Sequence, residues 1–264
     1  MKKSSEGQCS SLSDPTKISA RTKVIASIAI FSALYTVLRM MQTIPMIGVE
    51  GGKFSLSDML APLYGVILGP YVGGFSVILG TFLAISLGRP VSFLFLDFLP
   101  AMVNAVALGF LVRRKWWPVV VLNAALLVAF LLNPLTSLFI TVGGVSFPFA
   151  WLHIVAFVVL LSPLGRKAGQ WVETLKPASL TAGLAILAFI GTMMQHLMGN
   201  ILTEVVYGQI TGAMSAGAFE IMWTGVFFVY PWERLVLIIL AVVVGAPLVR
   251  VLKKSFFRSE NQTP

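Results

Sequence analysis

The chain has 264 residues, of which 57% are hydrophobic and 11% are charged, and its mean hydropathy is +0.90. Soluble domains carry about 25% charged residues to cover a surface that faces water, so this composition excludes an ordinary soluble domain and indicates lipid as the solvent. Cys9 is the only cysteine, which excludes a disulfide framework and a metal site built from cysteines. We expect neither a metal nor a cofactor.

The chain starts with a polar, serine-rich stretch that lacks the apolar core of a cleavable signal peptide. We interpret residues 1–21 as a cytoplasmic tail, residues 22–252 as one transmembrane helical domain and residues 253–264 as a second cytoplasmic tail. An apolar helix of about 20 residues crosses a hydrocarbon core of about 30 Å. Apolar runs occur at about 22–41, 57–69, 71–88, 91–112, 117–141, 147–164, 179–202 and 221–250. The sequence therefore predicts an all-α integral membrane protein, a polytopic bundle of about 6–8 transmembrane helices.

The basic residues orient this bundle. With eight spans and the N-terminus inside, only Arg39, Lys53, Arg89 and Arg234 of the 19 lysines and arginines fall on the outer side. Lysine and arginine concentrate on the cytoplasmic side of membrane proteins, so we predict that the N- and C-termini are both cytoplasmic. The formal net charge of +9 then reflects topology. Membrane lipid, through its anionic headgroups, is the expected partner of the basic ends, and nucleic acid is not.

A run of small residues follows the first apolar stretch. Ser55 and Asp58 supply an N-cap signal before the second run. Small residues at helical spacing let helix backbones approach closely in lipid. We expect helix packing at five glycines: Gly65, Gly69, Gly73, Gly80 and Gly88.

The segment from Phe54 to Gly74 reads FSLSDMLAPLYGVILGPYVGG. It resembles the substrate-binding (S) components of energy-coupling-factor (ECF) transporters, and the resemblance extends over about residues 22–113. It implies high-affinity capture of a small vitamin-like molecule for uptake across the cell membrane. It also implies partners, namely a transmembrane coupling subunit and cytoplasmic ATPase subunits. Ala29 and Ala33 match the small-residue pair on the first helix with which the family docks on the coupling subunit. The family's usual core has six helices, fewer than the runs counted here, so no pocket residue is transferred.

The sequence carries no motif for catalysis. It lacks a phosphate-binding loop, an HExxH zinc motif and a Gly-x-Ser-x-Gly elbow. We therefore expect no enzyme activity in this chain, and partner subunits would hydrolyse ATP.

Polar residues inside the spans are the candidate substrate ligands, because polar groups are costly in lipid. In the seventh run, His196, Asn200 and Glu204 recur every four residues, which predicts one helical face at the outer third and mouth of the span. The alternative is a hydrogen-bonded brace between helices, with Glu204 in water.

Two further pairs are candidates. Asp97 and Asn104 share a face of the fourth run, although Asp97 can instead cap a helix or pair with Arg89, and Asn104 can bind a neighbouring helix. Glu220 and Trp223 begin the last run, where Trp223 either stacks on a planar ligand or belongs to the aromatic belt at the membrane surface. The loop 42–54 is a candidate lid over an outward-facing pocket.

Two rival functions remain open at this point. A secondary transporter would use Asp97, His196 or Glu204 to carry protons, but the two halves of the sequence show no convincing inverted repeat. A membrane-embedded enzyme, or a scaffold for one, would need the polar residues within the spans for turnover.

Overall fold

The structure is a computed structural model that describes residues 20–45 and 53–258. The centre of the loop predicted as a lid, residues 46–52, lies outside the described residues. The helices are α1 (Ala20–Met40), α2 (Leu56–Leu68), α3 (Pro70–Ser86), α4 (Leu99–Val112), α5 (Trp116–Leu131), α6 (Trp151–Leu161), α7 (Pro163–Glu173), α8 (Pro177–Thr203) and α9 (Ala216–Arg258). A π-helical segment, η1 (Glu204–Ile210), continues α8. Two antiparallel hairpins pair β1 (Gln42–Pro45) with β2 (Lys53–Ser55) and β3 (Phe139–Val142) with β4 (Val145–Pro148).

The chain is an all-α polytopic membrane protein. Among the described residues, α1, α8 with η1, and α9 are long and apolar enough to cross a membrane, and α6 with α7 form a fourth candidate, bent by 69°. The apolar helices α3, α4 and α5 are shorter. Each predicted apolar run contains a helix, so the prediction of a polytopic helical bundle is confirmed.

The fifth and sixth runs were predicted too long. Residues 132–150, between α5 and α6, hold the β3–β4 hairpin instead of membrane helix. Its apolar residues extend the hydrophobic runs on both sides, and several of them are β-branched, a type that favours strands. Gly143 and Gly144 both have positive φ, as a tight two-residue hairpin turn requires.

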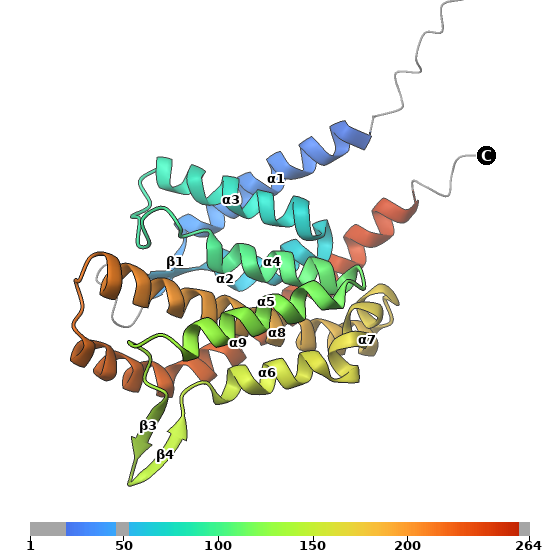
Figure 1. The fold of residues 1–264 in the computed structure, drawn as a ribbon. Coiled ribbons are helices and arrows are strands. Elements are labelled where there is room, and N and C mark those ends of the chain that lie inside the picture. The colour runs from blue at the N-terminus through green and yellow to red at the C-terminus, as the bar shows by residue number, and fades with distance from the viewer. Residues whose placement is uncertain (1–19, 46–52, 259–264) are drawn as a thin grey trace, which may run out of the picture.

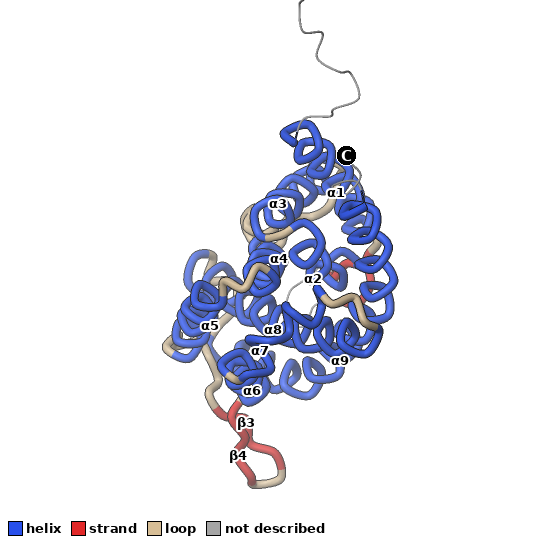
Figure 2. The backbone as a smooth tube through the Cα atoms, turned by 90° about the vertical axis from the view of Figure 1, so that its right-hand side faces the viewer, coloured by secondary structure: helices blue, strands red, loops and turns tan. Residues whose placement is uncertain are grey.

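The two ends of the bundle differ. The start of α1 and the end of α9 lie at one end, called the inner end below, and both hairpins lie toward the opposite, outer end (Figure 1). This placement agrees with the predicted topology, in which the two termini share one side of the membrane. Within the bundle, α8 packs against α4, α5, α6, α7 and α9 and occupies the centre, whereas α1 packs mainly on α3 at the edge (Figure 2).

Two of the predicted glycines lie at close helix approaches. A Cβ atom on Gly65 of α2 would overlap the backbone carbonyl of Ala105 in α4. A Cβ atom on Gly80 of α3 would lie 2.8 Å from the Tyr35 side chain in α1. Because real Cβ atoms are not found this close to other atoms, the α2–α4 and α3–α1 contacts both depend on glycine.

The other three glycines serve the joints and turns. Gly69 has a φ of +81° and joins α2 to α3, and Gly73 faces the backbone of Tyr64 across this joint. Gly88 departs from the prediction of helix packing, because no atom lies within 4 Å of its Cβ position. Its φ of +96° instead suits the turn that ends α3, a conformation that glycine adopts without a steric penalty.

Candidate functional site

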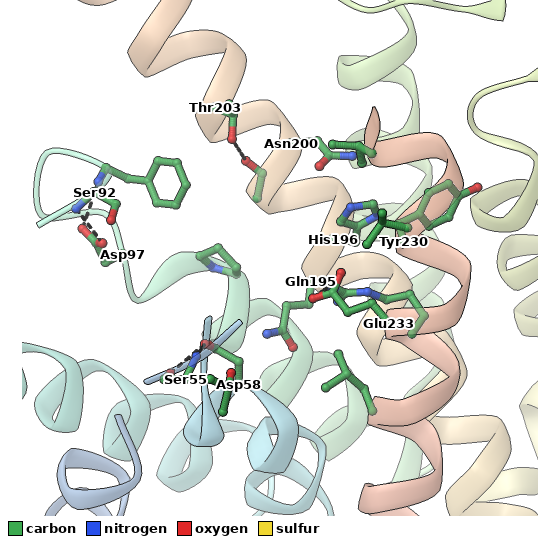
Figure 3. Close-up of a pocket in the computed structure, with 18 of the residues that line it drawn as sticks. Ser55, Asp58, Ser92, Asp97, Gln195, His196, Asn200, Thr203, Tyr230 and Glu233 are labelled. Carbon is green, nitrogen blue, oxygen red and sulfur yellow. Dashed lines mark hydrogen bonds and ion pairs between the residues drawn. The ribbon is translucent and has the colours of Figure 1, made fainter. Parts of the chain in front are cut away.

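A cavity of about 460 Å³ opens in the outer half of the bundle, and we call it the outer cavity. Its walls come from α8, the first half of α9, the end of α1, the start of α2 and the loop between α3 and α4 (Figure 3). These segments are far apart in sequence. The central position of α8, which contacts α2, α4 and α9, brings them together.

The α8 wall carries both amide side chains of the cavity lining. Gln195, His196, Gly199, Asn200 and Thr203 line the cavity and recur at helical spacing on one face. The Nδ2 atom of Asn200 is buried and, within the described part of the chain, has no hydrogen-bond partner. A buried amide without a partner costs free energy, so this atom is free to bind a ligand acceptor.

Gln195 is held from behind by Asn104 of α4. The Nδ2 atom of Asn104 donates to the Oε1 atom of Gln195 at 2.7 Å, across the α4–α8 contact. Asn104 is fully buried and does not line the cavity. Because this bond uses the carbonyl oxygen of Gln195, the amide NH₂ group is the part of that side chain left to face a ligand.

Aromatic rings form a flat wall next to the amides. The rings of His196 and Tyr230 stack with centroids 5.1 Å apart and planes 27° apart. Behind them, the Nε2 atom of His153 lies 3.0 Å from the Nδ1 atom of His196. The hydroxyl of Tyr230 donates to the carbonyl oxygen of Phe149 at 3.0 Å. These bonds fix the rings, so the cavity presents a rigid aromatic surface.

Charged groups close the cavity on two sides. Arg39 lies 3.7 Å from the carboxylate of Asp58 and donates to the carbonyl oxygen of Asp97 at 3.3 Å. Arg234 is buried in α9 and pairs with Glu233 at 3.0 Å. The formal charges cancel within each pair, so these two pairs add polar groups to the cavity lining without adding net charge.

The loop between α3 and α4 adds Asp97 and Arg89. The carboxylate of Asp97 accepts hydrogen bonds from the backbone N–H groups of Ser92 and Phe93 at 2.9 and 3.1 Å. It therefore holds its own loop together, while it also lines the cavity. Burial, together with the positive charge of Arg39, lowers the pKa of the Arg89 guanidinium, which remains cationic at neutral pH.

The structure brings four of the seven predicted substrate residues to the cavity and leaves three outside. His196, Asn200, Asp97 and Trp223 line it, and the indole N–H of Trp223 donates to the carbonyl oxygen of Leu135 at 2.9 Å. Asn104 lies behind the wall. Glu220 is exposed on α9, away from its predicted partner. Residues three apart on a helix point about 60° apart, so Glu220 and Trp223 need not share a ligand.

Glu204 is the main correction to the predicted site. It is 0% exposed, where the sequence placed it at the mouth, and its Oε1 atom lies 2.6 Å from the Thr136 hydroxyl. Glu204 follows His196 by eight residues, and at 3.6 residues per turn this is about 80° more than two full turns. The Glu204 side chain therefore points away from the face that carries His196. Thr203 takes the expected place at the cavity.

Several lining residues were missed as ligands. The sequence marks Arg39 and Arg234 only as basic residues on the outer side, and Arg89 also as an alternative partner of Asp97, although all three line the cavity. Their position on the outer side, against the usual cytoplasmic concentration of Lys and Arg, was the signal that could have identified them. A basic residue in that position needs a local partner. No comparable signal marked Tyr230. Among the residues that the structure describes, no group of three or more His, Cys, Asp or Glu side chains could hold a metal ion.

Comparison with known proteins identifies the family. Residues 19–165, more than half of the chain, match the family described as ECF-type riboflavin transporter, S component. The chain belongs to this family. As an ECF S component it is a substrate-binding subunit of a vitamin-type transporter, a class that works with a membrane coupling subunit and ATPase subunits. No curated protein and no solved structure matches the chain. The match ends early in α7, so the α8 and α9 walls of the cavity lie beyond it.

Proposed function

We propose that this S component captures riboflavin, or a molecule with the same planar ring system and hydroxylated chain, in the outer cavity. The observation that carries the proposal is the rigid stack of His196 and Tyr230, flanked by the free amide groups of Gln195 and Asn200. A flat aromatic wall suits a planar heteroaromatic ring. The two amides can donate to the ring carbonyls.

The size and lining of the cavity support this proposal. Sites for small molecules and cofactors have volumes of about 300–1,000 Å³, mostly apolar walls and a few placed polar groups. The outer cavity of about 460 Å³ falls within this range. Its charged rim, with Arg39, Asp58 and Glu233, supplies both donors and acceptors for the hydroxyl groups of a ribityl chain.

The exposed face of α1 supports a docking role. Ala29 and Ala33 are exposed on this helix, and the large apolar residues Ile25, Ile30 and Val37 are exposed on it too. Small residues let a second helix approach closely in lipid. Our proposal therefore includes docking of a coupling subunit on this face, with ATPase subunits at the inner end.

A titration of riboflavin fluorescence with the purified chain in detergent tests the capture proposal. We expect saturable quenching, because stacking on an aromatic ring quenches the fluorescence of the flavin. Asn200→Ala and His196→Ala should both weaken binding. Gln209→Ala is the matched control, because Gln209 is an exposed amide at the outer end that does not line the cavity.

Two results would contradict the proposal. One is folded protein that gives no saturable signal with riboflavin but a saturable thermal shift with another vitamin. The other is equal loss of binding in Gln209→Ala and Asn200→Ala, because binding would then not depend on the outer cavity.

A further inference from the structure

A second hollow, of about 430 Å³, lies at the inner end of the bundle, away from the outer cavity. We call it the inner groove, and it is lined by Leu111, Arg114, Trp116, Trp117, Gly165, Arg166 and Gln170. It lies between the α4–α5 turn and α7, which Figure 1 shows at the same end as the start of α1.

One arginine of the groove is held in place by an aromatic ring. The Cζ atom of Arg166 lies 4.3 Å from the ring centroid of Trp116, a cation–π contact. The indole N–H of Trp116 in turn donates to the carbonyl oxygen of Leu160 at 2.8 Å. Because the ring is fixed, the guanidinium on its face is pre-oriented and loses little freedom when it binds an anion.

The opposite side of the groove is also positive. Arg114 pairs with Glu173 at 3.0 Å, but both side chains are largely exposed, and exposed pairs of this kind are weak. α5 begins at Trp116 beside them, and its first N–H groups add partial positive charge. Two arginines and one carboxylate give the groove a net positive charge, which favours binding of an anion.

Exposed basic residues surround the groove at Arg113–Lys115 and on α7, a pattern typical of the cytoplasmic headgroup region. α6 has 11 residues, about 16 Å of helix, and α7 turns away from it by 69°. On α7 the buried residues Gly165, Ala168, Gly169 and Val172 share one face, and Arg166 and Lys167 are exposed on the other. The buried face packs against α4 and α8, so Arg166 and Lys167 are left exposed at the inner end of the bundle.

An exposed apolar track leads from the groove toward the membrane core. Trp117 is 69% exposed, and Val121 and Val128 follow it on the same face of α5. On the neighbouring helix α6, Leu161, Val158 and Ile154 are exposed at helical spacing as well. A soluble anion would gain nothing from such a track, whereas acyl chains would cover it.

We propose that the inner groove binds one anionic phospholipid of the inner leaflet, with its phosphate between Arg114 and Arg166 and its acyl chains along α5 and α6. The charge of the groove selects an anionic headgroup, and the apolar track selects a lipid over a free phosphate. This site is separate from the outer cavity and from the exposed face of α1, so it does not depend on the proposed riboflavin capture.

Native mass spectrometry of the full chain with added phosphatidylglycerol or phosphatidylcholine tests the proposal. We expect one tightly bound phosphatidylglycerol and weaker phosphatidylcholine binding. Arg166→Gln and Arg114→Gln should each weaken phosphatidylglycerol binding about fivefold, the effect expected for one basic residue near an anionic surface. Lys23→Gln is the control, because Lys23 is exposed on α1 at the same end but outside the groove. It should leave binding unchanged.

Three outcomes would overturn the proposal. The first is unchanged phosphatidylglycerol binding in both arginine variants. The second is an equal loss in Lys23→Gln, which would show general attraction to basic residues. The third is full displacement of the lipid by glycerol phosphate, which would identify a soluble-anion site. Unchanged melting temperatures of the variants would show that any loss of lipid is local to the groove.

Discussion

Gln195 reaches the outer cavity in a defined orientation because Asn104 donates to its carbonyl oxygen at 2.7 Å. We predict that Asn104→Ala weakens riboflavin binding although Asn104 does not line the cavity. Loss of one buried hydrogen bond costs about 1 kcal/mol, which is roughly fivefold in Kd. A fluorescence titration measures the change.

Asn123→Ala is the matched control for this substitution. Asn123 is a buried amide on α5 that does not line the cavity, so its removal tests general destabilisation. Equal weakening of riboflavin binding in the two variants would contradict a positioning role for Asn104.

Alanine variants of Glu204 and Asn200 should distinguish a structural role from a ligand-binding role. Glu204 bonds with Thr136 outside the cavity, so Glu204→Ala should destabilise the fold by about 1–3 kcal/mol, the cost of a broken buried polar contact. The Kd of the Glu204→Ala variant for riboflavin should stay within about twofold of the value for the unsubstituted protein, because no contact with the ligand is lost. Asn200→Ala should show the reverse pattern. Melting temperature and fluorescence titration, measured on the same preparations, decide between them.

These residues also show how far sequence reasoning reached at the site. The rule that polar residues in spans are functional found His196 and Asn200, which lie at the cavity. The same rule could not distinguish them from Glu204. Each step of four residues turns the side chain about 40° further around the helix, and a single sequence does not show at which residue the side chain leaves the cavity. Tyr230 could not be distinguished from the aromatic belt, since its role depends on stacking with His196 from another helix.

At the scale of elements, the close contact between α2 and α4 depends on a glycine, Gly65. A Cβ atom at Gly65 would overlap the backbone of Ala105. Gly65→Ala should therefore force the helices apart and destabilise the protein by about 1–3 kcal/mol, as overpacking does. Gly217→Ala is the control, because nothing lies within 4 Å of its Cβ position in α9. Thermal unfolding in detergent measures the effect, and equal melting temperatures of the two variants would contradict this account.

The exposed face of α1 gives a prediction about transport. Ala29→Trp and Ala33→Trp should leave riboflavin binding intact, because both residues are exposed and neither lines the outer cavity. Uptake by cells that contain the coupling and ATPase subunits should fall strongly, since bulky rings prevent close helix approach. Val155→Trp, on the exposed face of α6, is the matched control and should transport normally. Normal uptake in all three variants would exclude docking through Ala29 and Ala33.

Among the elements, the sequence predicted the helices better than their ends. Each apolar run contains a helix, because a membrane helix needs a long apolar stretch, although only three or four of the described candidates are long enough to cross a membrane. The predicted runs include the β3–β4 hairpin, because its strands hold several apolar residues and hydropathy does not distinguish a short apolar strand from a helix. The bend between α6 and α7 was also missed, although Ser162 and Pro163 mark it.

For the whole molecule, the two hollows and the charge distribution have a common explanation. Basic residues collect at the inner end, where two of them line the inner groove. At the outer end, three arginines line the outer cavity beside carboxylates. The outer arginines depart from the positive-inside pattern, and the cost of that departure is met by the ion pairs Arg39–Asp58 and Arg234–Glu233.

This explanation requires that the inner end face the cytoplasm, and labelling of whole cells tests it. In a Cys9→Ser background, Thr141→Cys places a thiol on the exposed β3–β4 hairpin, and Lys115→Cys places one on the exposed α4–α5 turn. A membrane-impermeant maleimide should label position 141 in intact cells and position 115 only after permeabilisation. The opposite pattern would turn the outer cavity toward the cytoplasm. It would contradict capture from outside even if purified protein bound riboflavin, because binding in detergent does not depend on orientation.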